Sequence, residues 1–117
     1  MNTKNTQLEW VVMRTITDDI YYALFGKTTM ALLLYFELPP ICMMDSEDDL
    51  LRDHFSELAL DALANIEGTM ADLLESREVN LSQVRGIIRQ YAEEVAIEAK
   101  AQAAGAGIDL LTGSAVN

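Results

Sequence analysis

The sequence predicts an all-α fold, a compact antiparallel bundle of four to five helices in a single domain. Half of the 117 residues are apolar, which is enough to build a core. Only 7% are aromatic, and six glycines and two prolines are too few for a loop-rich all-β fold. Apolar residues recur at the three- and four-residue spacing of a helix with one buried face. We expect a helical domain over residues 1–104 and a flexible or loosely docked C-terminal tail over 105–117.

The first helix is expected from Thr6 to Phe25, with Gly26 as its C-terminal cap. Tyr21 is expected on the side away from the core. The segment from Thr28 to Leu38 is apolar on all sides, so periodicity alone allows a buried helix or a buried strand. Its methionine, alanine and three successive leucines favour a helix. Four core positions of the first helix share one face: Leu8, Val12, Ile16 and Ile20.

A third helix is expected from Ser46 to about Glu78. Ser46 and Asp49 approximate a capping box, and Gly68 is a point where the helix is expected to kink or break. The fourth helix is expected to begin at Asn80 or Ser82 and to fray after Gly105.

The fourth helix carries a heptad-like seam for packing against another helix or a second copy of the chain. A narrow side of alanines beside the seam would let another helix approach closely. The seam consists of Val84, Ile88, Tyr91 and Val95, and the alanines are Ala92, Ala96, Ala99 and Ala103.

The sequence contains only weak matches to motifs of phosphate-binding, catalytic or metal sites. The run from Gly26 to Thr29 resembles the end of a phosphate-binding loop, but Tyr21 stands where that loop needs a glycine. His54 is the only histidine and is expected to be a structural, partly buried residue facing the core. Cys42 and its neighbouring methionines are expected to pack as soft side chains. We therefore expect no enzyme activity, no metal site and no cofactor.

The chain has a net charge of -11 and a single cysteine. Such a charge repels nucleic acids and anionic membranes, so direct binding to either is not expected. One cysteine excludes an internal disulfide and fits a reducing compartment. The most apolar run, Met30 to Phe36, is far shorter than the roughly 20 residues of a membrane span. We expect a cytoplasmic protein.

Negative charge is concentrated between Asp45 and Glu78, where 11 residues are acidic and only Arg52 and Arg77 are basic. Like charges four residues apart on a helix cost about 0.2–0.5 kcal/mol per pair, a cost that folding does not require. A cationic partner would explain it, unless Arg85 and Arg89 neutralise part of the row within the fold. The expected partner-binding residues are Glu47, Asp48, Asp49, Asp53, Glu57 and Asp61, the last four at four-residue spacing on one helix.

Two functions follow from these features. The first is an inhibitor that occupies the basic nucleic-acid-binding surface of an enzyme or complex. In size, charge and expected helicity, the chain is similar to the small acidic DNA-mimic proteins that phages and mobile elements use against restriction or CRISPR systems. The alternative is a homodimeric helical adaptor, chaperone or assembly factor that uses an apolar helix face, such as the seam of the fourth helix.

Overall fold

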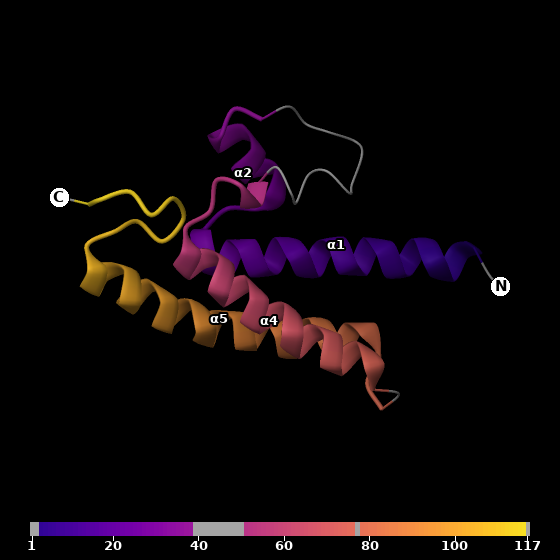
Figure 1. The fold of residues 1–117 in the computed structure, drawn as a ribbon. Helices are drawn as coiled ribbons and strands as arrows, with labels where there is room; N and C mark the ends of the chain where they lie inside the picture. The colour runs from indigo at the N-terminus through magenta and orange to yellow at the C-terminus, as the bar shows by residue number, and fades with distance from the viewer. Residues whose placement is uncertain (1–2, 39–50, 77, 117) are drawn as a thin grey trace.

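The computed structural model describes residues 3–38, 51–76 and 78–116, with the side chains of the first helix described from residue 13 onward. Helices account for 74% of these residues, which contain no strand, so the all-α class is confirmed. The only strand-like pairing among them is a single antiparallel bridge between Ile108 and Ala115. The helices are α1 (Thr3–Phe25), α2 (Thr29–Tyr35), α4 (Glu57–Glu75) and α5 (Leu81–Ala106), as Figure 1 shows.

The junction between α1 and α2 confirms a helix after Gly26, although α2 ends at Tyr35, before the expected end at Leu38. The backbone N–H of Gly26 donates to the carbonyl of Tyr22 (2.8 Å) and closes the last turn of α1. Thr28 is the N-cap of α2, and its hydroxyl accepts from the N–H of Ala31 (3.4 Å). The backbone N–H of Thr29, the first residue of α2, donates to the carboxylate of Asp18 in α1 (3.0 Å).

The expected third helix, from Ser46 to about Glu78, is wrong over residues 53–56. Leu51 and Arg52 are helical, residues 53–56 are not, and α4 starts only at Glu57. The break has a local cause, since the hydroxyl of Ser56 accepts from the N–H of Ala59 (3.0 Å) and caps a new helix. Ser46 and its expected cap lie outside the described residues. The expected alternative of a break at Gly68 is also wrong, because α4 continues through it to Glu75.

The start of α5 confirms one of the two expected caps. Asn80 accepts from the N–H of Gln83 (2.9 Å), and the side chain of Gln83 accepts from the N–H of Asn80 (2.8 Å). This reciprocal capping box satisfies two donors that a helix start leaves free. At its other end α5 runs to Ala106, two residues past the expected domain boundary at residue 104.

The core is organised around α5, which packs against both α1 and α4. In Figure 1, α5 lies beneath α1 along much of its length, with α4 on its near side. Alanines face α1 and α4 along much of α5, which permits close approach of the helices because a methyl group fills little space. The buried residues of α5 are Val84, Ile88, Ala92, Ala96, Ala99 and Ala103.

Tyr21 is buried, with 0% of its surface exposed, although its helical position predicted the outer side of α1. It packs edge-on against Phe55, with ring centroids 5.8 Å apart. The rings of Phe25 and Phe55 also lie close together (5.0 Å). The segment before α4 therefore adds a second buried side to α1, which the periodicity of α1 alone does not show.

The C-terminal tail, expected to be flexible or loosely docked, lies against the start of α4. Leu110 and Leu111 are buried in the core. The hydroxyl of Ser56 donates to the carbonyl of Leu110, and the N–H of Ser56 donates to the carbonyl of Leu111 (2.8 Å). The side chain that caps α4 thus also holds the tail.

Candidate protein-binding surface

Three of the six expected partner-binding residues are described, and all three are exposed: Asp53, Glu57 and Asp61. Asp53 lies in the turn before α4, whereas Glu57 is the first residue of α4 and Asp61 follows one turn later. The expected row on one helix is therefore wrong at Asp53, because the chain is not helical there. The other three expected residues, Glu47, Asp48 and Asp49, lie outside the described part of the chain.

The exposed face of α4 carries a longer set of carboxylates than the predicted row. At 100° per residue, Glu57, Asp61, Asp72 and Glu75 fall on one face. All four are exposed, and we call them the α4 acidic face. Within the described residues, none of the four has an ion pair or a side-chain hydrogen bond. The sequence contained the signal for Asp72 and Glu75, but an expected break at Gly68 separated them from the row.

A groove between α4 and α5 adds a carboxylate from the second helix. The groove has a volume of about 150 Å³, and both Asp61 and Glu98 line it. On α4 the neighbouring Asn65 accepts a hydrogen bond from the hydroxyl of Tyr91 (2.8 Å), which ties the two helices together. Because Asp61 and Glu98 are 37 positions apart in the printed sequence, only the packing of the helices brings Glu98 to this surface.

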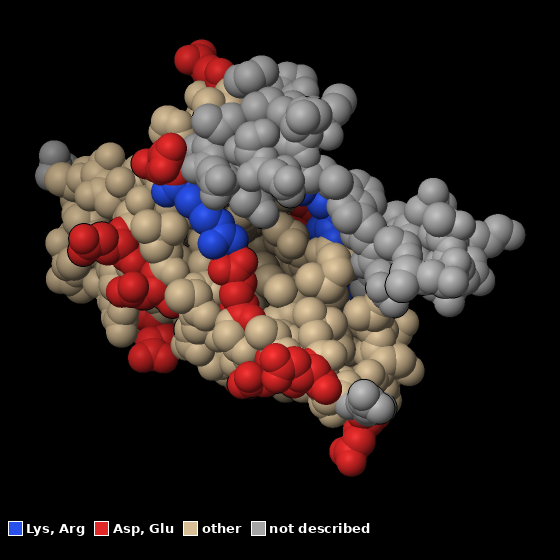
Figure 2. Space-filling view, turned by 45° about the vertical axis from the view of Figure 1, so that its right-hand side comes forward, with Lys and Arg blue, Asp and Glu red and all other residues tan. Residues whose placement is uncertain are grey.

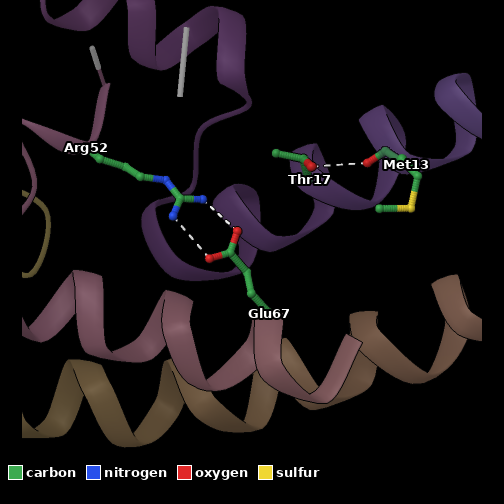
Figure 3. Close-up of polar contacts among 4 residues, drawn as sticks. All are labelled: Met13, Thr17, Arg52 and Glu67. Carbon is green, nitrogen blue, oxygen red and sulfur yellow. Dashed lines mark hydrogen bonds and ion pairs between the residues drawn. The ribbon is translucent and has the colours of Figure 1, made fainter. Parts of the chain in front are cut away.

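Arg52 and Arg85 form ion pairs with carboxylates outside the α4 acidic face. Arg52 and Glu67 form a two-bond pair, which Figure 3 shows (Nη1–Oε1 3.1 Å, Nη2–Oε2 2.6 Å). Arg85 donates through Nε to Asp19 of α1 (2.9 Å). In each pair the hydrogen bond to the carboxylate raises the pKa of the arginine above its ordinary value. Arg85 therefore joins α5 to α1, and neither Arg52 nor Arg85 pairs with the α4 acidic face.

The distribution of charge over one side of the molecule is visible in Figure 2. Acidic side chains form several separate groups on a mostly uncharged surface, and the visible basic side chains are fewer. A cationic partner would therefore meet several points of negative charge separated by neutral surface.

The seam predicted on α5 packs inside the molecule. Val84 and Ile88 are buried, and Tyr91 and Val95 are partly buried against the same core. The seam is therefore a helix-packing surface for α1 and α4, and its buried residues offer no contact to a second copy.

His54 does not face the core as expected. It lies in the turn before α4 and is exposed, because residues 53–56 are not helical. Its ring stacks on Phe36 with a centroid distance of 4.6 Å and an interplanar angle of 16°. Cys42, Met43 and Met44 lie outside the described residues.

In the parts of the chain that the structure describes, no group of three or more His, Cys, Asp or Glu residues is arranged to hold a metal ion. The helices seen there are all too short or too polar to cross a membrane. Comparison of the chain with protein-family models, with curated proteins and with solved structures finds no match.

Proposed function

We propose that this chain, an antiparallel helical bundle, acts by protein–protein binding as an inhibitor that occupies the basic nucleic-acid-binding surface of an effector. The observation that carries the proposal is the α4 acidic face, with four exposed carboxylates on one rigid helix and no cationic partner among the described residues. Proteins that bind nucleic acids present lysine and arginine side chains to the phosphate backbone. The carboxylates along α4 carry the same sign of charge as a phosphate backbone, and can therefore occupy the basic surface that binds the backbone.

The geometry of α4 supports this proposal. At a rise of 1.5 Å per residue, Glu57 and Glu75 lie about 27 Å apart along the helix axis. Glu57 and Asp61 are a like-charge pair four residues apart, and Asp72 and Glu75 are a pair three residues apart. Together they cost α4 about 0.4–1 kcal/mol. The helix dipole offsets part of this cost at Glu57, in the first turn of α4, but not at Asp72 and Glu75. Glutamine at Asp72 and Glu75 would remain solvated without the cost, so binding to a cationic surface is a physical reason for the charges there.

The test compares two variants of equal net charge. Asp53, Glu57 and Asp61 are changed to lysine in the first variant. In the control, three exposed acidic residues outside α4 are changed to lysine: Glu37, Glu78 and Glu93. Both are used with the unchanged chain to capture proteins from the native host lysate at low and high salt. We expect the unchanged chain and the control to capture the same Lys- and Arg-rich protein, and the first variant to lose it.

The captured protein is then purified and tested for binding to its nucleic acid. The unchanged chain and the control are expected to inhibit that binding, and added salt to weaken the inhibition steeply. Full inhibition by the Asp53, Glu57 and Asp61 variant would contradict the proposal. Circular dichroism of both variants checks that the helices remain, since a lysine at Glu57 opposes the dipole at the start of α4.

The second candidate function is a homodimeric adaptor, chaperone or assembly factor. The seam of α5 does not support a dimer, because its core residues are buried within the fold. However, α2 exposes two large apolar side chains one turn apart. Met30 is 51% exposed and Leu34 is 69% exposed. A dimer through this face would persist at high salt in light scattering and dissociate on Leu34→Glu. The matched control is Ala64→Glu, on the exposed face of α4.

A further inference from the structure

A cavity of about 640 Å³ lies where the end of α1, the end of α5 and the C-terminal tail meet. This volume falls within the range of about 300–1,000 Å³ typical of small-molecule sites. Its walls are largely apolar, as is usual for such sites. The apolar lining includes Leu24, Phe25, Ala103, Ile108, Leu110 and Leu111.

The charge of the cavity is opposite to that of the chain. Lys27 and Lys100 both line it, and they are two of the three lysines in a chain of net charge -11. The Nζ of Lys27 lies 5.0 Å from the ring centroid of Tyr35, which also belongs to the wall. The aromatic ring thus holds one ammonium group at the cavity. Among the described residues, Asp109 is the only acidic one in the lining.

Several other polar groups of the wall are engaged within the fold. Oδ2 of Asp109 accepts from the N–H and the hydroxyl of Thr112, both at 3.0 Å. The carbonyl groups of Leu110 and Leu111 accept from Ser56. At the end of α5, the carbonyls of Ala103 and Ala104 accept from the N–H groups of Ile108 and Gly107.

We propose that this cavity binds a small amphipathic carboxylate. The apolar body of the ligand contacts the leucine-rich wall, and its carboxylate pairs with the ammonium groups of Lys27 and Lys100. Charged hydrogen bonds of this kind are stronger than neutral ones. The proposal is independent of the α4 acidic face, since no residue of that face lines the cavity.

The probe is octanoate, whose binding to the full chain is measured by isothermal titration calorimetry. Octylammonium and 1-octanol have the same apolar body with a positive or a neutral head. We expect octanoate to bind at one site, 1-octanol to bind about tenfold more weakly and octylammonium not to bind. The tenfold step is the order expected for one charge-assisted contact. Equal affinity for octanoate and octylammonium would overturn the proposal, as would the absence of octanoate binding.

Two sets of variants locate the site. Lys27→Gln and Lys100→Gln are each expected to weaken octanoate binding about tenfold, whereas Arg89→Gln, which removes a charge outside the lining, leaves it unchanged. Ala104 lines the cavity and is exposed, so Ala104→Trp fills the space without disturbing the core. Its control is Ala101→Trp, on an exposed position of α5 outside the lining. Octanoate binding that survives Ala104→Trp as well as it survives Ala101→Trp would overturn the proposed location.

Discussion

Arg52 and Glu67 face each other through two parallel hydrogen bonds, which join the segment before α4 to the middle of α4. Their side chains are 31% and 36% exposed, so the pair is partly shielded from water. Figure 3 shows the planar guanidinium aligned with the carboxylate, beside the bond from the hydroxyl of Thr17 to the carbonyl of Met13 (3.1 Å). The pair fixes the position of the segment that precedes α4, although this segment is not part of α4.

Glu67→Gln is expected to lower the free energy of unfolding by about 1–2 kcal/mol, because it leaves a half-buried guanidinium without its carboxylate. Urea denaturation measures the change. Asp19→Asn breaks the more exposed pair with Arg85 and is the control, with a much smaller expected effect. Replacing both Arg52 and Glu67 by methionine is expected to recover part of the loss, since no uncompensated charge remains. An equal loss from Glu67→Gln and Asp19→Asn would contradict this interpretation.

Ser56→Ala removes two roles of one hydroxyl, the cap of α4 and the bond to the tail. A lost cap costs about 1 kcal/mol, and a lost buried hydrogen bond adds a similar amount. We expect a loss of about 2 kcal/mol in the free energy of unfolding. Hydrogen exchange of the tail amides should also become faster.

Asn80→Ala is the matched control for Ser56→Ala. It removes the cap of α5 at an exposed site that does not touch the tail. We expect a loss of about 1 kcal/mol and unchanged hydrogen exchange in residues 108–116. Tail exchange that accelerates equally in both variants would show that Ser56 does not specifically hold the tail.

Gly113→Ala is expected to destabilise the docked tail. Gly113 has a φ of 77°, and an added Cβ would lie 3.2 Å from the Cβ of Ser56. The left-handed backbone and the close approach both oppose a side chain, so we expect a loss of about 1–2 kcal/mol. Gly68→Ala is the opposite case, because Gly68 lies inside α4 with open space around it. It should raise the free energy of unfolding by about 0.5–1 kcal/mol in the same denaturation assay.

Ile88→Ala tests whether the seam of α5 is core. Ile88 is fully buried, so the truncation is expected to cost about 2–4 kcal/mol through lost burial and a residual cavity. Ile97 lies on the same helix with 72% of its surface exposed, and Ile97→Ala should change the free energy of unfolding by less than about 0.5 kcal/mol. A small effect of Ile88→Ala on unfolding would place the seam at the surface and restore it as a dimer contact.

The extension of the α4 acidic face beyond Gly68 makes a separate prediction about binding. Lysine at Asp72 and Glu75 should weaken binding of the captured partner about as much as lysine at Glu57 and Asp61. Loss of binding confined to the Glu57 and Asp61 variant would restrict the partner surface to the first half of α4. Titration of each variant against the purified partner at two salt concentrations gives the comparison.

The sequence by itself determined the helical class and two helix ends, the end of α1 and the start of α5, because these depend on contacts between near neighbours. The side chain of Asn80 caps α5 by accepting from the N–H of Gln83, three residues later. Gly26 directly follows the last turn of α1, so signals within a few residues were enough to predict both ends. The heptad-like spacing of Val84 and Ile88 also predicted buried positions. Periodicity reports which side of a helix is apolar, and that property belongs to the sequence.

Only the tertiary structure decided which surfaces are covered and by what. Tyr21 is buried because Phe55 packs on it from a distant part of the chain, and Leu110 and Leu111 are buried because Ser56 binds the tail. Glu98 lines the same groove as Asp61 because α5 packs against α4. The cavity with Lys27 and Lys100 depends on the same long-range packing. Such contacts join residues far apart in sequence, whereas local propensity and periodicity act over a few turns of helix.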